Sequence, residues 1–202
     1  MDRSDCAELN YIVPIANLPS ILDLGILSHN RVAEIEHKSV AMVEIQEIRS
    51  SVKLPNDQDL HDYANLYFNA RNAMLYKVIS ESSHRDLAVL RIDSAVLDHP
   101  GVIASDTNAA RNMVRFGTPN EIVPLLDRDR LFARSWDHAN LVMKYRHKGE
   151  MCAEVLIPHS VPTEYLIGIS VSCEATKSVV SQLCDTLPVI VNEYQFFQGE
   201  SR

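Results

Sequence analysis

Glycine is scarce in this chain of 202 residues: it has six, and neither GxGxxG nor GxxxxGK[ST] occurs. These two patterns use glycine to bring backbone N–H groups close to a phosphate, so the Rossmann and P-loop classes of nucleotide-binding protein are disfavoured. The GxSxG nucleophile elbow and the HExxH zinc-protease motif are also missing, and the histidines are scattered singly. No hydrolase or metalloprotease of these classes is therefore indicated.

Cysteine is also infrequent, and the cysteines have no CxxC or other metal-type spacing: Cys6, Cys152, Cys173 and Cys184. This pattern predicts reduced and mostly buried thiols rather than disulfides or a zinc site. No metal is expected in the protein.

No apolar run approaches the roughly 18 residues that are needed to cross a bilayer. The chain begins Met-Asp-Arg-Ser-Asp-Cys, an acidic start without the basic and apolar regions of a signal peptide. We therefore expect a cytoplasmic protein with no membrane association.

Positive charge is outnumbered: the formal net charge is −8, which argues against a broad basic face that coats duplex DNA. One segment departs from this balance. Its basic residues, opposed only by Asp127, Asp129 and Asp137, are Arg128, Arg130, Arg134, Lys144, Arg146 and Lys148. This cationic segment predicts a small, local contact with nucleic acid rather than the extended face of a duplex-binding repressor.

The remaining composition is ordinary for a globular protein, with 46% hydrophobic and 23% charged residues, and we expect one domain spanning residues 1–202. Strands are predicted at residues 9–14, 26–28, 75–79, 87–92, 102–104, 155–158, 167–171 and 189–191. Helices are predicted at residues 17–24, 39–51, 105–114, 119–126 and 174–183. Residues 127–149 have weak periodicity, which predicts a mixture of helix and loop.

The first strand, the first helix and the extended residues 26–28 form a compact unit that delivers His29 and Asn30 to a loop. Asn17 suits the N-cap of the helix, and Gly25 suits the left-handed closing position. Such a unit can hold a ligand, but the same composition also suits plain structure.

One carboxylate, Glu154, starts an apolar stretch that ends at Pro158 and predicts a short buried strand. A carboxylate at the mouth of a buried strand costs several kcal/mol unless it is paired, hydrogen-bonded or placed in a functional cleft. Glu154 is therefore either a solvated residue at the strand end or a functional group.

Residues 61–76 form the densest run of polar and aromatic side chains in the chain. Tyr, Phe, Asn, Arg and Met together can stack on, and hydrogen-bond to, a planar base or a nicotinamide ring. Aromatic residues of this kind also build protein cores, and both interpretations stand for this run.

A set of short segments between residues 11 and 169 recurs in one known family in the same order. The segments are Asn17-Leu18-Pro19-Ser20-Ile21-Leu22, Gly25 with Leu27-Ser28-His29-Asn30, Ile45-Gln46-Glu47 with Arg49, Leu60-His61-Asp62-Tyr63, Tyr67-Phe68, Arg71 with Met74-Leu75-Tyr76, Ser105-Asp106, and Ala153-Glu154-Val155-Leu156. In this order they resemble the DarT toxins, which are DNA-base ADP-ribosyltransferases of bacterial toxin–antitoxin pairs. The ordered set is more specific than any one of its motifs.

The resemblance implies an α+β protein with the ADP-ribosyltransferase fold: a split mixed β-sheet core, surrounding helices and an NAD cleft. It implies NAD as co-substrate, without a metal, and attachment of ADP-ribose to a base in single-stranded DNA. The implied partners are single-stranded DNA and a cognate antitoxin, a macrodomain hydrolase in one branch and another ADP-ribosyl-glycosidase in the other. We expect a monomer.

By position, Glu154 matches the family's catalytic glutamate, and Arg49 matches an arginine between NAD and the target base. The NAD cleft is expected to be lined by Tyr11, Ile12, Asn17, Gly25, Leu27, His29, Asn30 and Tyr67. The DNA groove is expected to use Arg71, Asn72, Met74 and Tyr76 on one wall and Arg134, Trp136, Tyr145, Arg146 and Lys148 on the other. The aromatic members suit base stacking, and the cations suit phosphates.

The chain departs from the family pattern at three places. Tyr11-Ile12-Val13-Pro14 replaces a His-Ile-Thr-His type of sequence, Asn72-Ala73 replaces Ser-Pro, and Asn108 replaces a histidine of some relatives. One branch of the family modifies thymine and another modifies guanine, and these departures favour the guanine-directed branch. Two alternatives stay open: transfer to RNA or protein, and a non-catalytic NAD-binding module.

Overall fold

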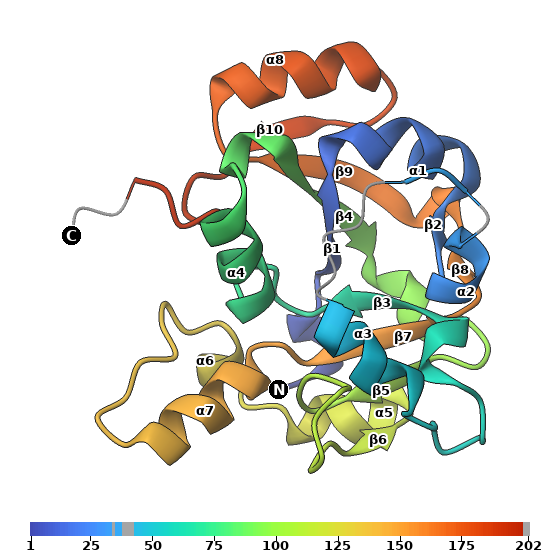
Figure 1. The fold of residues 1–202 in the computed structure, drawn as a ribbon, viewed down its shortest axis with the longest axis vertical. Helices are drawn as coiled ribbons and strands as arrows, with labels where there is room; N and C mark the ends of the chain where they lie inside the picture. Colours follow the sequence, from blue (N-terminus) through green and yellow to red (C-terminus); the bar gives the residue numbers. More distant parts are fainter. Residues whose placement is uncertain (34, 38–42, 200–202) are drawn as a thin grey trace.

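The computed structural model describes residues 1–33, 35–37 and 43–199. Their core is an eight-stranded mixed sheet in the order β10-β9-β4-β1-β3-β7-β5-β6 (Figure 1). The strands are β1 (Glu8–Pro14), β3 (Tyr63–Tyr67), β4 (Leu87–Asp93), β5 (Ile103–Ser105), β6 (Phe116–Gly117), β7 (Glu154–Pro158), β9 (Leu166–Val171) and β10 (Val189–Val191). β9 and β10 are parallel and the other described neighbours are antiparallel, while β2 (Ile26–Leu27) and β8 (Ser160–Val161) form a separate ribbon.

The sheet is split between β1 and β3. β1 pairs with β4 along its whole length, whereas the pairing of β1 with β3 is limited to Asn10↔Tyr67 in the described chain. β3 then pairs with β7 along its length, ending at Tyr67↔Glu154. Glu154 therefore lies where the two halves of the sheet separate, and the split that the resemblance implies is present.

Helices flank the sheet (Figure 1). α1 (Leu18–Leu24) and α2 (His29–Val32) lie near the β2–β8 ribbon, and α8 (Glu174–Leu183) lies against β10. α3 (Val43–Ser50) and α4 (Ala73–Glu81) lie on either side of the split in this view. α5 (Pro119–Ile122) packs at β5 and β6, and α6 (Arg128–Leu131) contacts α7 (Leu141–Glu150) at one corner.

Short 3-10 helices connect these elements. They are η1 (Arg3–Asp5), η2 (Ile15–Asn17), η3 (Leu60–Asp62), η4 (His84–Asp86), η5 (Ser94–Asp98), η6 (Val123–Leu125) and η7 (Thr163–Tyr165). No helix in the described part of the chain is both long and apolar enough to cross a bilayer.

Gly25 fixes the turn between α1 and β2. Its backbone is left-handed, with φ of 78°, and an added Cβ would lie 2.2 Å from the carbonyl oxygen of Val161 in β8. Only glycine fits both the conformation and this close approach. The turn thereby holds α1 directly against the β2–β8 ribbon.

β7 is buried on both faces. Val155 and Ile157 belong to the largest core cluster, and Leu156 belongs to a second cluster with Leu60 and Ala109. A strand covered on both sides requires an unbroken apolar run, which this sequence supplies. The strand therefore carries Glu154 into the interior of the protein.

Most of the predicted elements are confirmed. The strands at residues 9–14, 26–28, 87–92, 102–104, 155–158, 167–171 and 189–191 are present, with shifts of at most one residue at their ends. The helices at residues 17–24 and 174–183 are present, and residues 119–126 form α5 and η6. Residues 127–149 do combine short helices with a loop.

Three predictions are wrong, and one lies partly outside the described residues. Residues 75–79 belong to α4 because the Asn72 side chain caps a helix there. Residues 105–114, all described, contain no helix, because Ser105 Oγ donates to the Thr107 carbonyl oxygen and closes a turn instead. His29 and Asn30 begin α2, which Ser28 caps, rather than lying in a loop. The start of the helix predicted from residue 39 lies outside the described residues.

Candidate active site

Glu154 is fully buried at the start of β7 and is paired with Arg49, from the last turn of α3. Nη1 of Arg49 donates to Oε1 at 3.2 Å and to Oε2 at 3.1 Å, and Nη2 donates to Oε2 at 3.1 Å. The guanidinium is itself almost buried, because Arg49 is 6% exposed. The interpretation of Glu154 as a solvated residue at a strand end is therefore wrong.

The loop after β5 holds the same carboxylate from the other side. The backbone N–H of Ala109 donates to Oε1 of Glu154 at 3.0 Å. The N–H of Glu154 donates to Ser105 Oγ at 3.2 Å, and this hydroxyl donates in turn to the Thr107 carbonyl oxygen at 2.7 Å. A charged carboxylate that accepts several N–H groups is fixed in orientation as well as stabilised.

The electrostatics of the pair keep Arg49 positively charged. Burial lowers the pKa of Arg49, but the negative charge of Glu154 and the hydrogen bonds to it raise that pKa by more, so the net shift is upward. Removal of one member of a buried ion pair leaves an uncompensated charge and typically costs about 3–5 kcal/mol. Each of the two residues is thus required for the other to be buried.

Two further groups beside Glu154 stay neutral. Burial, followed by the negative charge of Glu154, raises the pKa of Tyr67 well above its ordinary value. Burial also raises the pKa of Cys152 to about 11, so its thiol is protonated at neutral pH. A thiol is a poor nucleophile compared with a thiolate, so Cys152 does not suit a covalent mechanism.

A cleft bounded by β1, α1, α2 and β3 reaches the Arg49 side of the pair. Among the residues expected to bind NAD, those that line it are Tyr11, Ile12, Asn17, Gly25, Leu27 and His29. Asn30 is exposed and donates to Asp62 Oδ1 at 2.7 Å, and Tyr67 is buried beside Glu154. The structure therefore brings most of the expected NAD residues to one surface together with Arg49.

The cleft has further polar residues that the sequence does not assign to NAD: Gln46, His61, Tyr63 and Asn65. The rings of His29 and His61 lie together, with centroids 4.1 Å apart. Burial lowers the pKa of both, and the nearby Arg49 charge lowers it further. His61 lies within the polar and aromatic run of residues 61–76, so the sequence did contain a signal for it.

One expected wall of the DNA groove is largely internal. Arg71 is 4% exposed and Asn72 is fully buried, and the Asn72 Oδ1 accepts the N–H groups of Met74 and Leu75. The expected direct DNA contact of these two residues does not fit their burial. The Asn72 side chain caps the start of α4, and the Arg71 guanidinium donates to the carbonyl oxygens of Tyr194 and Arg134. On the same helix, Tyr76 is 51% exposed and Met74 is partly buried.

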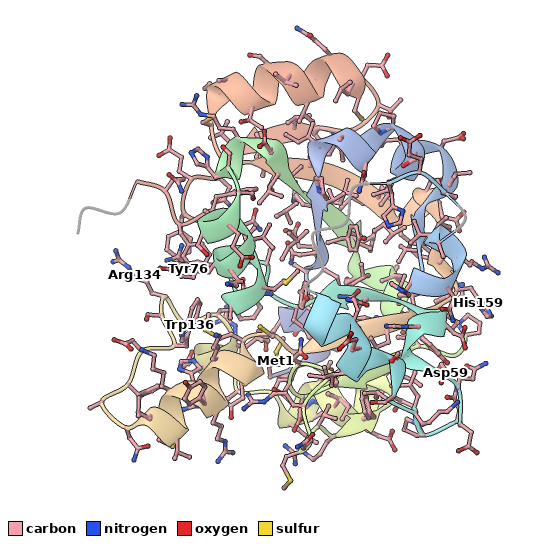
Figure 2. All side chains as sticks on the ribbon, in the orientation of Figure 1. Met1, Asp59, Tyr76, Arg134, Trp136 and His159 are labelled. Atoms are coloured by element: carbon pink, nitrogen blue, oxygen red, sulfur yellow. The ribbon has the colours of Figure 1, made fainter. Side chains whose placement is uncertain are left out.

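The other expected wall is exposed and cationic. Arg134, Tyr145, Arg146 and Lys148 all lie on the surface of α7 or the loop before it, and Trp136 is partly exposed. Arg146 donates to Glu150 at 2.9 Å, which offsets part of its charge. Figure 2 shows Arg134, Trp136 and Tyr76 close together at one edge of the molecule, far from His159 and Asp59.

No group of three or more His, Cys, Asp or Glu side chains within residues 1–33, 35–37 and 43–199 is placed to hold a metal ion. Of the four free cysteines, Cys6, Cys152 and Cys184 are buried and Cys173 is half-buried, so the predicted burial of most thiols is confirmed.

Residues 10–197 match a family model described as "ssDNA thymidine ADP-ribosyltransferase, DarT". The DNA ADP-ribosyl transferase-DNA ADP-ribosyl glycohydrolase fusion protein of Thermosipho africanus (strain H17ap60334) is 31% identical over 202 residues, covering 94% of this chain and 49% of the relative. The chain therefore spans about half the length of that protein. The DNA ADP-ribosyl transferase of Thermus sp. (strain 2.9) is 29% identical over 136 residues, 62% of this chain and 65% of that one.

Two solved structures have a similar fold. Thermosipho africanus DarTG in complex with ADP-ribose superimposes with a TM-score of 0.86 at 29% identity, covering 95% of this chain and 51% of that chain. Thermus sp. 2.9 DarT in complex with ADP-ribosylated ssDNA gives a TM-score of 0.84 at 22% identity, covering 95% and 97%. These similarities confirm the expected α+β fold, in which helices flank a large mixed sheet.

Proposed function

The chain belongs to the DarT family of ssDNA ADP-ribosyltransferases, and from this membership we propose that it transfers ADP-ribose from NAD to a base of single-stranded DNA. The observation that carries the proposal is the buried pair of Arg49 and Glu154, placed where the sheet splits. The cleft that reaches this pair supplies a site for the co-substrate.

The residues of the cleft suit NAD. Ligand sites are mostly apolar with a few convergent polar groups, and here Ile12 and Leu27 supply apolar surface beside the side chains of Tyr11 and Asn17. The Nε2 atom of His61 is buried without a hydrogen-bond partner among the described residues, so it is a further group that can bond to a ligand. We infer that NAD binds here with its nicotinamide ribose directed toward Glu154.

Glu154 is assigned to the bond that breaks. Transfer cleaves the bond between the nicotinamide nitrogen and ribose C1′, and the ribose becomes positively charged as nicotinamide leaves. A carboxylate beside it stabilises this oxocarbenium-like state and accepts a hydrogen bond from a ribose hydroxyl. The N–H of Ala109 and the guanidinium of Arg49 hold the carboxylate in one orientation for this role.

Arg49 is assigned to the acceptor base. A base is a weak nucleophile, so the base must lose a proton as its bond to C1′ forms, and negative charge develops on it. Arg49 retains its positive charge, orients the base and stabilises this charge, and Glu154 accepts the proton. The products are nicotinamide, the ADP-ribosylated base and a proton, so the reaction is balanced without a metal.

The proposed acceptor is unpaired DNA. An enzyme acting on a duplex base must flip it out of the stack at a cost of a few kcal/mol, which a single strand avoids. We propose guanine as the modified base, because the departures at Tyr11-Ile12-Val13-Pro14, Asn72-Ala73 and Asn108 favour that branch. Thymine is the competing acceptor, since the description of the matching family model names thymidine.

A toxin that marks DNA needs an antitoxin that removes the mark. The Thermosipho africanus relative joins a DNA ADP-ribosyl transferase and a DNA ADP-ribosyl glycohydrolase in one chain. We infer a glycohydrolase antitoxin as the partner of this chain. We also propose that residues 1–202 act as one monomeric transferase domain in the cytoplasm.

The test uses the purified chain, NAD and four single-stranded oligonucleotides, each lacking one of the four bases. Mass spectrometry detects an added ADP-ribose, and the release of nicotinamide is followed in parallel. We expect the adduct to be lost only from the oligonucleotide without guanine. Loss only from the one without thymine would support the competing base.

Two results would overturn DNA-base transfer. Release of nicotinamide without an adduct on any oligonucleotide would move the acceptor to RNA or protein, and labelled NAD with each class would identify it. Binding of NAD without release of nicotinamide would show a non-catalytic NAD-binding module.

A further inference from the structure

Three aromatic rings from distant parts of the chain meet beside the exposed cationic wall. The ring of Phe197 lies 5.1 Å from that of Tyr76 and 6.2 Å from that of Trp136, and Tyr76 and Trp136 are 5.6 Å apart. The planes are inclined by 77° to 83°, the edge-to-face arrangement that ring quadrupoles favour. Phe197 is the member that follows β10, close to the end of the described chain, and no pattern in the sequence predicts its place.

The buried guanidinium of Arg71 contacts this aromatic cluster. The guanidinium carbon of Arg71 lies 4.1 Å from the centroid of the Phe197 ring and 4.2 Å from that of Tyr194. The same guanidinium donates to the carbonyl oxygens of Tyr194 and Arg134. Arg71 thereby joins the start of α4, the loop before α7 and the segment after β10, and desolvated cation–π contacts of this kind contribute about 2 kcal/mol or more.

Phe197 is directed to its place by an unusual backbone. Its φ is 58°, a left-handed conformation that is uncommon for a bulky aromatic residue and costs on the order of 1–3 kcal/mol. The preceding residue, Phe196, is fully buried in an apolar cluster that also contains Tyr67 and Cys152. One aromatic side chain therefore anchors the segment in the core, and the next turns back to contact Trp136.

The same apolar cluster connects the aromatic rings to the active site. Trp136 and Phe197 pack against it, and Tyr67, which pairs with Glu154 across β3 and β7, belongs to it. A base stacked on these rings would therefore be connected to the strand pair that carries Glu154 through packed side chains rather than through a free loop.

The chemistry of the surface suits an unstacked nucleobase. Tyr76 and Tyr194 are about half exposed, at 51% and 49%, and Arg134 lies beside Tyr76 and Trp136 in Figure 2. Proteins that bind single strands combine such aromatic faces with cations for the phosphates, and each stacked base contributes about 1–3 kcal/mol. An apolar peptide would gain nothing from the cations.

We propose that Phe197 and Arg71 are positioning residues that hold Trp136 and Tyr76 as a stacking platform for a base of single-stranded DNA adjacent to the modified base. This inference rests on the proposed function. It replaces the expected direct DNA contact of Arg71 with an indirect one, and it makes the segment after β10 part of DNA recognition.

The first experiment uses Trp136, the only tryptophan in the chain, as an intrinsic probe. Its fluorescence is titrated with a single-stranded oligonucleotide in the absence of NAD, and then with an abasic strand of the same length and charge. We expect strong quenching by the first strand and little by the second, because stacking needs the base and not the phosphates. Equal quenching by both strands would overturn the platform.

The second experiment tests Phe197 itself. Phe197→Ala should raise the Kd of the oligonucleotide and the KM for DNA about tenfold, the range expected for loss of one stacked base. The Kd of NAD should match that of the unchanged protein, and Phe197→Tyr, which keeps the ring, should restore DNA binding. Val179→Ala, an exposed apolar change on the remote helix α8, is the matched control and should alter none of these values.

The outcomes separate this proposal from the proposed function. If Phe197→Ala transfers ADP-ribose to DNA with the same KM for DNA as the unchanged protein, the stacking platform is wrong and the proposed transferase activity stands. If the bases quench Trp136 fluorescence but the unchanged protein does not transfer ADP-ribose to DNA, the stacking platform stands and the proposed transferase activity is wrong. If Phe197→Ala does not fold, Arg71→Lys tests the same contact, because it keeps the charge but loses the planar fork, and it should raise KM for DNA similarly.

Discussion

Arg49 and Glu154 are 105 positions apart in the sequence, yet Nη1 of Arg49 lies within hydrogen-bond distance of both carboxylate oxygens, at 3.2 and 3.1 Å. The contact joins the end of α3 to the start of β7, on the side of the split sheet that carries the cleft. Both side chains are withdrawn from water, so the pair links the stability of the fold to the proposed chemistry.

Removal of one member of the pair should destabilise the protein strongly. Arg49→Met leaves the fully buried Glu154 without a cation, and we expect the free energy of unfolding to fall by about 3–5 kcal/mol in urea denaturation. The double variant Arg49→Met/Glu154→Met should recover most of this loss, because no charge is then buried. Arg128→Met is the control: it breaks an exposed pair with Asp5 and should cost less than about 1 kcal/mol. If the double variant loses as much unfolding free energy as the sum of the losses in Arg49→Met and Glu154→Met, the two side chains do not stabilise each other.

Glu154→Gln should separate binding from chemistry. Glutamine keeps the size of the side chain and an oxygen for the Ala109 N–H, but it carries no charge to stabilise the ribose. We expect kcat for transfer to DNA to fall at least about a hundredfold, while KM for NAD changes less than about threefold. Rates are measured by mass spectrometry of the labelled oligonucleotide, with the exposed change Glu164→Gln as the control. Retention of full activity by a folded Glu154→Gln protein would remove Glu154 from the mechanism.

Ser105→Ala tests the loop that holds the carboxylate. The hydroxyl accepts the N–H of Glu154 and donates to the Thr107 carbonyl oxygen, so its removal leaves two buried groups without this partner. We expect a loss of about 1–3 kcal/mol in the free energy of unfolding, together with a lower kcat. Ser80→Ala removes an exposed hydroxyl on α4 and should change stability by less than about 0.5 kcal/mol. Equal stabilities of the two variants would show that Ser105 does not support the loop.

Elements governed by local signals could be predicted from the sequence. Gly25 marks the end of α1 because its left-handed turn admits little else, and α8 was predicted with its observed bounds. Residues 75–79 could not be assigned, because a short apolar run suits a strand and a helix equally. The segment is a helix because the Asn72 side chain caps it, whereas the resemblance assigns Asn72 to DNA binding.

A site residue could be predicted from the sequence where its type is unusual for its surroundings. It could not be predicted where its role depends on a backbone group or on a contact between distant parts of the chain. Glu154 could be identified because it is a lone carboxylate beside an apolar run, and the resemblance supplied Arg49. The N–H of Ala109 has no signature, since nearly any residue offers a backbone N–H. Phe197 depends on a contact with Arg71, which comes from a different part of the chain, and no periodicity records such a contact.

The two histidines of the cleft should make stability depend on pH. Burial lowers the pKa of His29 and of His61, and so does the positive charge of Arg49, although Asp59 and Asp62 act in the opposite direction on His61. In the unfolded chain the pKa of each histidine is about 6.5. Between the lowered values and 6.5 the unfolded chain therefore binds more protons than the folded protein does, and stability rises with pH in this window.

The stabilising effect of the neutral histidines is thus fully present above about pH 6.5 and is lost as the pH falls below it. Urea denaturation at pH 7.5, 6.5 and 5.5 should show a larger loss of unfolding free energy in the unchanged protein than in His29→Gln/His61→Gln, which lacks both groups. His99→Gln, a change outside the residues that line the cleft, should follow the unchanged protein. If the double variant loses as much stability as the unchanged protein, the two imidazoles titrate alike in the folded and unfolded states. In that case the cleft does not hold them neutral for NAD.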